Sequence, residues 1–514
     1  MTHPPRTPRS RGRARYMGVA LALVGVGAVA ASFAVHGHPV VGGVGANVPV
    51  NPGARNPGDI AANNSPSLAR DPVKPAVLAV ANRIDTPLYS CALDVSRDGG
   101  RTWSAVRVPI AVGEEPKCYA ADVIFASDGT LYMSYLTLRG AGNVPHAAWL
   151  VHSSDGGRTL SAPRRVLGPL AFQPRLTSDP ARPRRLYLTW LQASGTGLYR
   201  YTTPGNPIEV MRSDDGGAHW SAAVRVSSPA RQRVVSPVPV VGPHGVLYVL
   251  YLDLGGDVLD YEGAAGGSGG PPYGGHFSLV LGRSGDGGTT WSESVVDHSI
   301  IPTRRFIVFL APFPALAVDR RSGRIYAGFE DGRLGDPDVY VSSLAAGAGA
   351  WSRPVRVNDT PRHDGTAQYL PALAVAPDGR LDVIYYDRRA DPRNKLSTVS
   401  LQSSFDHGRT FSPHVILSDR AFNSQIGAGS ELGLPDLGSS LAIDSTDAQA
   451  LAVWTDTRAG TVLSNKQDIT FARATFSSSG GLGAAVRDLL RYGGVVAVLL
   501  GVAAALYAPA RLRP

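Results

Sequence analysis

An octapeptide that recurs five times constrains the fold of this chain more than any other feature. It reads Ser-x-Asp-x-Gly-x-Thr-aromatic, and its fullest copy spans residues 96–103. Its aspartates are Asp98, Asp155, Asp215, Asp286 and Asp406, spaced 57, 60, 71 and 120 residues apart. The last interval covers two periods, so one copy has lost its motif, and Ala-Gly-Ala-Gly-Ala-Trp351-Ser352 stands where it is expected. A period of about 60 residues indicates a repeated supersecondary unit.

The residues of this motif are those of a tight turn between two strands. The aspartate accepts backbone N–H groups, glycine supplies a positive φ, and the threonine and aromatic residue begin the next strand. The motif resembles the Asp-box, or BNR repeat, and over about residues 44–475 the chain resembles the sialidase superfamily of β-propellers. This resemblance implies an all-β propeller fold. It implies no particular activity, because the box is a structural turn.

A second repeated segment predicts the number of blades. Strands resembling Pro-x-Leu-Ala-Val start at Pro66, Ala121, Pro174, Pro237, Pro314, Pro371 and Ser439. Four short strands fit each period, so we predict a seven-bladed propeller, with six blades as the alternative. The last unit lacks a fourth strand, and residues 47–51, which resemble Val355–Asn358, are expected to supply it and close the ring. Residues 255–276 are expected to form a long flexible loop in the fourth blade.

Both ends of the chain carry uncharged apolar segments. Residues 17–34 follow an arginine-rich start, which is typical of an export signal that is either cleaved or kept as an anchor. Residues 493–510 precede two arginines that the positive-inside rule places in the cytoplasm; a buried core helix is the alternative. The predicted organisation is a signal peptide or anchor (1–37), a propeller (38–476), a juxtamembrane linker (477–492), a transmembrane helix (493–510) and a cytoplasmic tail (511–514).

Charge and composition exclude several functions. The net charge is +9, but five arginines in residues 1–15 and a surplus of three in 485–514 leave about +1 for the body. A near-neutral body lacks the basic surface that nucleic acids require. The twelve histidines show no zinc-ligand spacing, so we expect no metal and no cofactor. High Arg, Ala and Gly content with four lysines suggests a GC-rich bacterial source.

The two cysteines can form a disulfide bond if the body is exported. In an oxidising space Cys91 and Cys118 are expected to bridge, contributing roughly 3 kcal/mol; two unpaired thiols are the alternative.

The connections after the second strands are expected to carry an anion site. The boxes occupy the turns between third and fourth strands, so these connections lie on the opposite face, near the central channel. They carry Arg83, Arg139, Arg333, Arg388 and Arg458, with Asp331, Asp387 and Asp456 beside the last three. Arginine presents a fork of donors suited to carboxylate or phosphate, which predicts an anion site at this mouth. The alternative is that each arginine pairs with its own or a neighbouring blade's aspartate and fastens the ring.

The resemblance also raises the question of catalysis. Enzymes of the sialidase superfamily hold a carboxylate sugar with three arginines and use a tyrosine nucleophile activated by glutamate. Their Arg-Ile-Pro tripeptide is missing here, and the nearest stretch is Arg83-Ile84-Asp85, so no catalytic residue is carried over. Glu330, Tyr385 and Tyr386 end second strands near the predicted mouth and are the candidates for a catalytic pair. The alternative role for the tyrosines is packing.

Together these features predict a membrane-tethered propeller on the extracytoplasmic side of the cell membrane. Its expected partner is an acidic glycan or another anionic ligand, and not nucleic acid. Two other functions stay open: a sialidase-type glycoside hydrolase with a diverged site, and an envelope scaffold that assembles proteins on a rim.

Overall fold

The computed structural model describes most of the chain between residues 39 and 478. The described ranges are 39–54, 56, 58–195, 205–257, 273–303, 313–427 and 437–478, with a few positions nearer the two ends. The chain divides into two compact units, one of residues 43–475 and one of residues 1–42 with 476–514. The fold described below lies in the first of these units, apart from residues 39–42 and 476–478.

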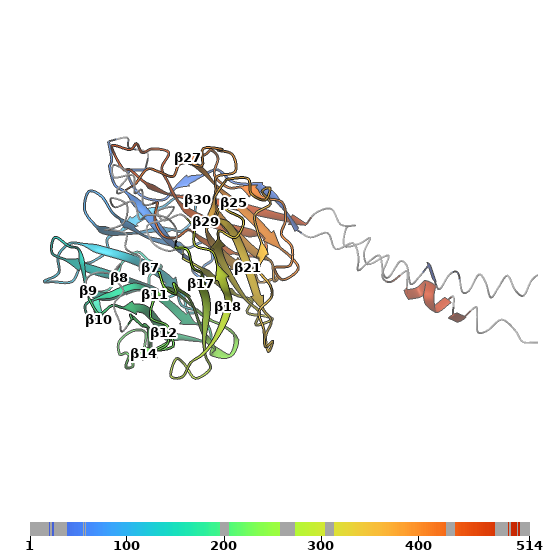
Figure 1. Cartoon of the computed structure of the whole chain (residues 1–514), viewed down its shortest axis with the longest axis horizontal. Coiled ribbons are helices and arrows are strands. Elements are labelled where there is room, and N and C mark those ends of the chain that lie inside the picture. Colours follow the sequence, from blue (N-terminus) through green and yellow to red (C-terminus); the bar gives the residue numbers. More distant parts are fainter. Residues whose placement is uncertain are drawn as a thin grey trace, which may run out of the picture. The chain divides into compact units, whose positions relative to one another are not determined.

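Seven antiparallel sheets, here called blades one to seven, follow one another in chain order (Figure 1). Blade one contains β3 (Asn63–Arg70), β4 (Leu78–Ile84), β5 (Ser90–Ser96) and β6 (Ser104–Val106). Blade two contains β7 (Cys118–Phe125), β8 (Leu131–Arg139), β9 (Val144–Ser153) and β10 (Arg164–Leu167). Blade three contains β11 (Ala171–Asp179), β12 (Arg182–Gln192), β13 (Ile208–Ser213) and β14 (Val224–Arg225). Blade four contains β15 (Val234–Val241), the 3-10 turn η1 (Pro243–Gly245), β16 (Leu247–Asp253), β17 (Phe277–Ser284) and β18 (Ser292–Ile300).

The remaining three blades complete the set. Blade five contains β19 (Ala315–Val318), β20 (Ile325–Asp331), β21 (Asp338–Leu344) and β22 (Val355–Arg356). Blade six contains β23 (Gln368–Val375), β24 (Leu381–Asp387), β25 (Leu396–Ser404) and β26 (Val415–Ile416), and β27 (Phe422–Asn423) also pairs with β25. Blade seven contains β28 (Ala442–Ser445), β29 (Gln449–Asp456) and β30 (Asp468–Ser478), with β1 (Pro39–Val44) and β2 (Val48–Pro49) beside β30.

The innermost strands of the blades form a ring. Each first strand contacts the first strands of both neighbouring blades, and β28 of blade seven contacts β3 of blade one. At that last junction Ser439 N donates to Ser65 Oγ at 2.9 Å. The second strands are covered on both faces by neighbouring blades, which explains why β24 is buried at all seven positions. The prediction of seven blades is therefore confirmed, and six is excluded.

The segment before the first blade pairs with the last strand of blade seven. Val48 lies opposite Phe471 and Pro49 opposite Thr470, antiparallel. Next to this pairing, Asn51 Oδ1 accepts from Ile469 N at 2.7 Å and its Nδ2 donates to Asp468 Oδ1 at 3.0 Å. Asn358, which follows the fourth strand of blade five, makes the equivalent bonds to Val339 N and Asp338 Oδ1. The sequence likeness between the two segments thus reflects equivalent positions.

The five boxes form the turns between third and fourth strands, as predicted. In the second box Asp155 Oδ1 accepts from Arg158 N and Thr159 N, and Thr159 Oγ1 donates to Asp155 Oδ2. Ser153 Oγ donates to Asp155 and accepts from Gly157 N. Hydrogen bonds from Ser153 and Thr159 hold the pKa of Asp155 well below its usual range. The fold is therefore the Asp-box β-propeller that the resemblance to the sialidase superfamily implied.

Two groups of predictions lie largely outside the described residues. They concern the segments 17–34 and 477–514, and residues 258–272 of the long connection in blade four. In the part of the chain that the structure describes, no helix is both long enough and apolar enough to span a bilayer.

A buried carboxyl group in blade one makes stability depend on pH. Asp94, in the middle of β5, has no exposed surface, and neither of its carboxylate oxygens has a hydrogen-bond partner among the described residues. Burial raises the pKa of Asp94 to about 7. In the unfolded chain the pKa is about 3.9, so between pH 4 and 7 the folded state holds the extra proton and stability falls as pH rises.

We therefore expect Asp94→Asn to be more stable than the unmodified protein at pH 8, by up to about 4 kcal/mol, and to match it near pH 4. Urea unfolding at both pH values measures the difference, with Asp128→Asn in an exposed turn as the control. An advantage of Asp94→Asn that does not grow with pH would contradict this account.

Candidate functional site

A bulge at the start of the first strand recurs around the ring and shapes one mouth of the channel. In five blades the pairing with the second strand shifts register at this point. The residues inside the bulges have positive φ; they are Ser65, Ala120, Gln173, Ser236 and Leu370. A bulge re-aims the neighbouring side chains, and in four of the five the following residue is the proline of the repeated strand motif. The side chains just before the bulges, including Asn64, Tyr119 and Tyr369, therefore lie at this mouth.

The first strands of all seven blades line one cavity of about 290 Å³, here called the channel cavity. Most of the residues that line it are apolar, Phe313 among them. Its charged residues are Asp122 of blade two and Arg175 of blade three. Asp122 accepts from Ser67 Oγ at 2.7 Å and from Leu176 N at 2.8 Å, so its carboxylate joins blades one, two and three.

Arg175 holds its charge in the channel with few partners. Its Nη1 lies 3.6 Å from Asp122 Oδ1, beyond hydrogen-bond distance, and its guanidinium carbon lies 5.6 Å from the centre of the Phe313 ring. No hydrogen bond from its side chain is present among the described residues. Because the side chain is also 23% exposed, its donors are available to a ligand in the channel cavity.

Arg333 fastens two blades to each other. It donates to Asp331 of its own blade and, at 2.7 Å, to Asp297 in β18 of the preceding blade. The same arrangement recurs in the next two blades, where Arg389 binds Asp387 and Asp359, and Arg458 binds Asp456 and Asp419. These arginines are occupied by carboxylates of the protein, as the alternative interpretation expected. The arginine that bonds to Asp387 is Arg389, and Arg388, which was predicted to bind a ligand, bonds to Ser424 instead.

Arg83 and Arg139 differ from each other in exposure. Arg83 is 6% exposed; its Nε lies 3.1 Å from Asp85 Oδ1 and donates to Asn64 Oδ1 at 2.6 Å, and its Nη1 donates to Tyr119 OH. The side chain of Arg139 is 49% exposed, and a carboxylate of Glu114 lies 3.8 Å away. The five predicted arginines therefore do not converge on one anion.

Arg388 lies instead in a buried cluster between blades five and six. It donates to Ser424 Oγ at 2.9 Å and to the Tyr369 hydroxyl at 3.4 Å, and its guanidinium carbon lies 4.8 Å from the centre of the Tyr369 ring. Glu330 accepts from Thr303 Oγ1 at 2.6 Å and from Leu370 N at 3.4 Å. Burial raises the pKa of Glu330 to about 7, against the effect of these bonds and of the Arg388 charge.

The predicted tyrosines form hydrogen bonds with groups other than Glu330. Tyr385 donates to Gln402 Oε1 at 2.5 Å and accepts from Arg389, whereas Tyr386 donates to Thr455 O of blade seven at 3.3 Å. Both rings are fully buried. In the described structure neither hydroxyl bonds to Glu330, so the predicted Tyr–Glu pair is not formed. The two tyrosines pack between blades.

The residues that sequence reasoning missed are Asp122, Arg175 and Tyr369. All three lie in first strands, where the prediction followed only the apolar positions of the motif. The signal available for Tyr369 is its place two residues before the motif proline, and for Arg175 its place one residue after it. Neither place indicates an inward side chain unless the bulge is known.

Cys91 and Cys118 are joined by a disulfide with their Cα atoms 5.4 Å apart. The bond links the start of β5 to the start of β7, so it ties blade one to blade two at this mouth. Among the residues that the structure describes, no group of three or more His, Cys, Asp or Glu side chains is placed to hold a metal ion.

No known protein family matches the sequence, and no curated protein matches it. Solved structures are similar to it in fold. An α-L-arabinofuranosidase from Fusarium graminearum is 16% identical over 71% of this chain and 98% of its own, with a TM-score of 0.47. A Hadza microbial sialidase is 14% identical over 77% and 76% of the two chains, with a TM-score of 0.43. An ulvan lyase is 12% identical over 80% and 94%, with a TM-score of 0.46.

Proposed function

We propose that the protein binds an acidic glycan in the channel cavity, with Arg175 as the contact for the carboxylate. The observation that carries this proposal is an arginine in the channel that is ion-paired with Asp122 at 3.6 Å but whose side chain makes no hydrogen bond among the described residues. The cavity volume of about 290 Å³ lies near the lower end of the range for ligand sites, about 300–1,000 Å³. It suits a single sugar residue. Its apolar lining, Phe313 included, offers packing for the face of a sugar ring.

Binding is favoured over hydrolysis because the parts of a sialidase site are not assembled. A sialidase-type site holds its sugar carboxylate with three arginines, but here Arg333 and Arg458 are each held by aspartates of two chain segments. Among the described residues no tyrosine bonds to Glu330, whose hydrogen-bond donors are Thr303 Oγ1 and Leu370 N. The hydrolase remains the second candidate, since the raised pKa of Glu330 suits a proton donor.

Calorimetric titration of the full-length protein with sialyllactose tests the proposal. Sialyllactose should bind, neutral lactose should bind at least about tenfold more weakly, and Arg175→Met should weaken sialyllactose binding by a similar factor. Arg158→Met, in an exposed box turn on the other face, is the matched control and should bind like the unmodified protein. Equal binding by Arg175→Met and the control would refute the channel site. Turnover of a fluorogenic sialoside that is lost in Arg388→Ala would favour the hydrolase.

We also propose that the propeller is exported and tethered to the outer side of the cell membrane through its terminal segments. The support is the charge pattern of residues 1–34 and 493–514. The disulfide between Cys91 and Cys118 agrees with an oxidising environment. We further propose that residues 47–51 close the ring by completing blade seven, which the pairing of β2 with β30 supports.

A further inference from the structure

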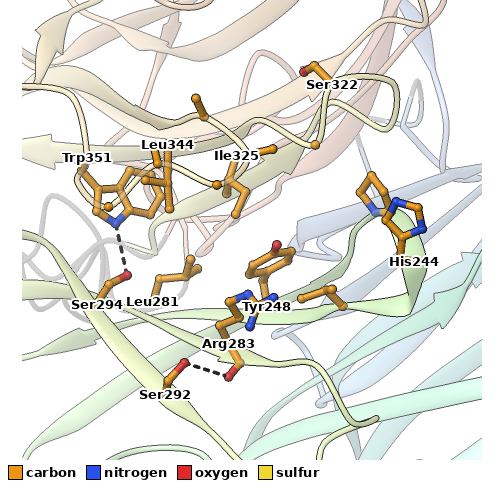
Figure 2. Close-up of a pocket in the computed structure, with 18 of the residues that line it drawn as sticks. His244, Tyr248, Leu281, Arg283, Ser292, Ser294, Ser322, Ile325, Leu344 and Trp351 are labelled. Carbon is orange, nitrogen blue, oxygen red and sulfur yellow. Dashed lines mark hydrogen bonds between the residues drawn. The ribbon is translucent and has the colours of Figure 1, made fainter.

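A second cavity, of about 530 Å³, lies between blades four and five on the face that carries the boxes. Its walls come from the two blades that meet there: Figure 2 shows Leu281 and Tyr248 of blade four facing Leu344 and Ile325 of blade five. Trp351 closes one side and donates its indole N–H to Ser294 Oγ at 3.2 Å. This box-face pocket is separate from the channel cavity and shares no lining residue with it.

The pocket lies where blade five has lost its box. The turn in blade five has kept its length, since Leu344 to Trp351 spans the same eight positions as Ser96 to Trp103. Its chemistry has changed: Leu344, Ala346, Ala348 and Ala350 replace the serine, aspartate, second glycine and threonine of the motif. None of the side-chain bonds that shape the other boxes can form in this turn. The serine after the aromatic residue is kept, and Ser352 N still donates to Ser343 O at 2.8 Å.

Replacement of the motif glycine explains why the turn leaves a space. In three of the five intact boxes that glycine lies against the preceding blade with no room for a side chain, whereas a Cβ on Gly288 or Gly408 would lie 3.7 Å or 3.6 Å from its nearest neighbour. A Cβ on Gly217 would lie 2.2 Å from Leu150, and one on Gly157 would lie 2.9 Å from Val95. Ala348 holds the same position in blade five, and its Cβ cannot approach the preceding blade as closely as that glycine does. Leu281, the counterpart of Leu150, consequently lines an open pocket.

A tyrosine that recurs in the second strands is less buried where the following box is missing. Tyr132, Tyr187 and Tyr326 each lie against the box of the following blade and are at most 4% exposed. Tyr248 holds the equivalent position in blade four, one residue after the strand position paired with the first box residue. It is only half-buried, and its ring lines the pocket. One aromatic face is therefore uncovered where the box is missing.

An arginine beside this tyrosine lacks the acceptor that its counterpart has. In blade three Arg212, which pairs with Tyr187, donates at 3.1 Å to the carbonyl of Gly287 in the next blade's box. Its counterpart Arg283 pairs with Tyr248 and lines the pocket (Figure 2). Its guanidinium has no hydrogen bond or ion pair among the described residues.

We propose that the box-face pocket binds an acidic sugar residue, whose carboxylate takes the place of the missing box acceptor on Arg283. The ring would pack on Tyr248 and Trp351, because sugar faces present C–H groups to aromatic rings. Arg283 supplies a forked donor for the carboxylate. The volume falls within the usual range for ligand sites, about 300–1,000 Å³.

The other charged groups of the pocket agree with an anionic occupant. Arg321 and His244 lie at its exposed margin. Glu293, its acidic residue, is already engaged by Ser228 N at 2.6 Å, by Arg231 at 3.1 Å and by the Tyr251 hydroxyl. Its negative charge is thereby offset before a ligand arrives.

The experiment restores the box by mutation and measures whether ligand binding is lost. The variant carries Leu344→Ser, Ala346→Asp, Ala348→Gly and Ala350→Thr on a turn of unchanged length. It is compared with Arg283→Met and with the control Arg158→Met. All are made in full-length Arg175→Met protein, so that the channel cavity does not contribute. The probe is a glucuronic-acid-containing tetrasaccharide, with its carboxyl-reduced form as the neutral match, followed by calorimetry.

We expect the acidic tetrasaccharide to bind and its reduced form to bind at least about tenfold more weakly. Arg283→Met should bind the acidic tetrasaccharide at least about tenfold more weakly than the parent. The restored-box variant should not bind it, and the control should bind it with the affinity of the parent. A raised melting temperature would show that the restored box has folded. The proposal is overturned if the folded, restored-box variant binds as the parent does, if both probes bind equally, or if the parent binds neither. None of these results bears on the channel cavity, which Arg175 alone tests.

Discussion

Deleting residues 39–51 should lower the free energy of unfolding by at least about 4 kcal/mol. The deletion exposes the edge of β30 and removes Val50, which is 3% exposed and whose N–H donates to Ile469 O at 2.8 Å. It also removes the hydrogen bonds that Asn51 makes with the buried Ile469 N–H and with the Asp468 carboxylate. Urea denaturation followed by circular dichroism measures the loss.

A milder variant keeps this prediction testable if the deletion prevents folding. Asn51→Ala leaves the strand in place but removes both bonds, and should cost about 2–4 kcal/mol. Asn56→Ala, in an exposed turn nearby, is the control and should change stability by less than about 0.5 kcal/mol. If Asn51→Ala proved as stable as the control, the N-terminal segment would not be what completes blade seven.

Gly100→Ala should destabilise the propeller by about 2–4 kcal/mol. The added Cβ would lie 2.4 Å and 2.5 Å from two ring carbons of Phe471, which is 2% exposed and has no space to retreat. The position also has a φ of +90°, a conformation that disfavours alanine. Thermal unfolding of the purified variant, with the disulfide intact, provides the measurement.

Gly156→Ala separates the two causes. Its φ of +73° is similar, but a Cβ there would meet nothing within 4 Å. Gly156→Ala should therefore lower the free energy of unfolding only by the cost of alanine at a positive φ, about 1 kcal/mol. Equal losses in the two variants would show that backbone conformation alone, and not packing between blades, selects glycine in the boxes.

The fold was predictable because it repeats. One box suggests little, but five aspartates at a steady period, each with glycine two residues later, indicate the same turn in the same place of each blade. The repeated Pro-x-Leu-Ala-Val strands then set the blade number. The eroded copy was predictable in position from the doubled interval before Asp406. Its consequence was not, because the cavity depends on how Ala348 fails to fit against the preceding blade.

The site was less predictable because function here depends on partners far apart in sequence. The arginines after the second strands were predicted to share one mouth as an anion site, but Arg333 is paired with Asp297, 36 residues earlier. Arg175 is paired more loosely, with Asp122 at 3.6 Å, and its place after a proline in a first strand does not show that its side chain enters the channel. Pairing between blades decides which charge is left for a ligand, and spacing within one blade does not reveal it.

A crystal structure of the full-length protein with sialyllactose tests the central claim most directly. We predict the ligand's carboxylate within hydrogen-bond distance of the Arg175 guanidinium, inside the cavity lined by the first strands. Sialyllactose bound on an outer rim, with the channel holding only water, would contradict the account.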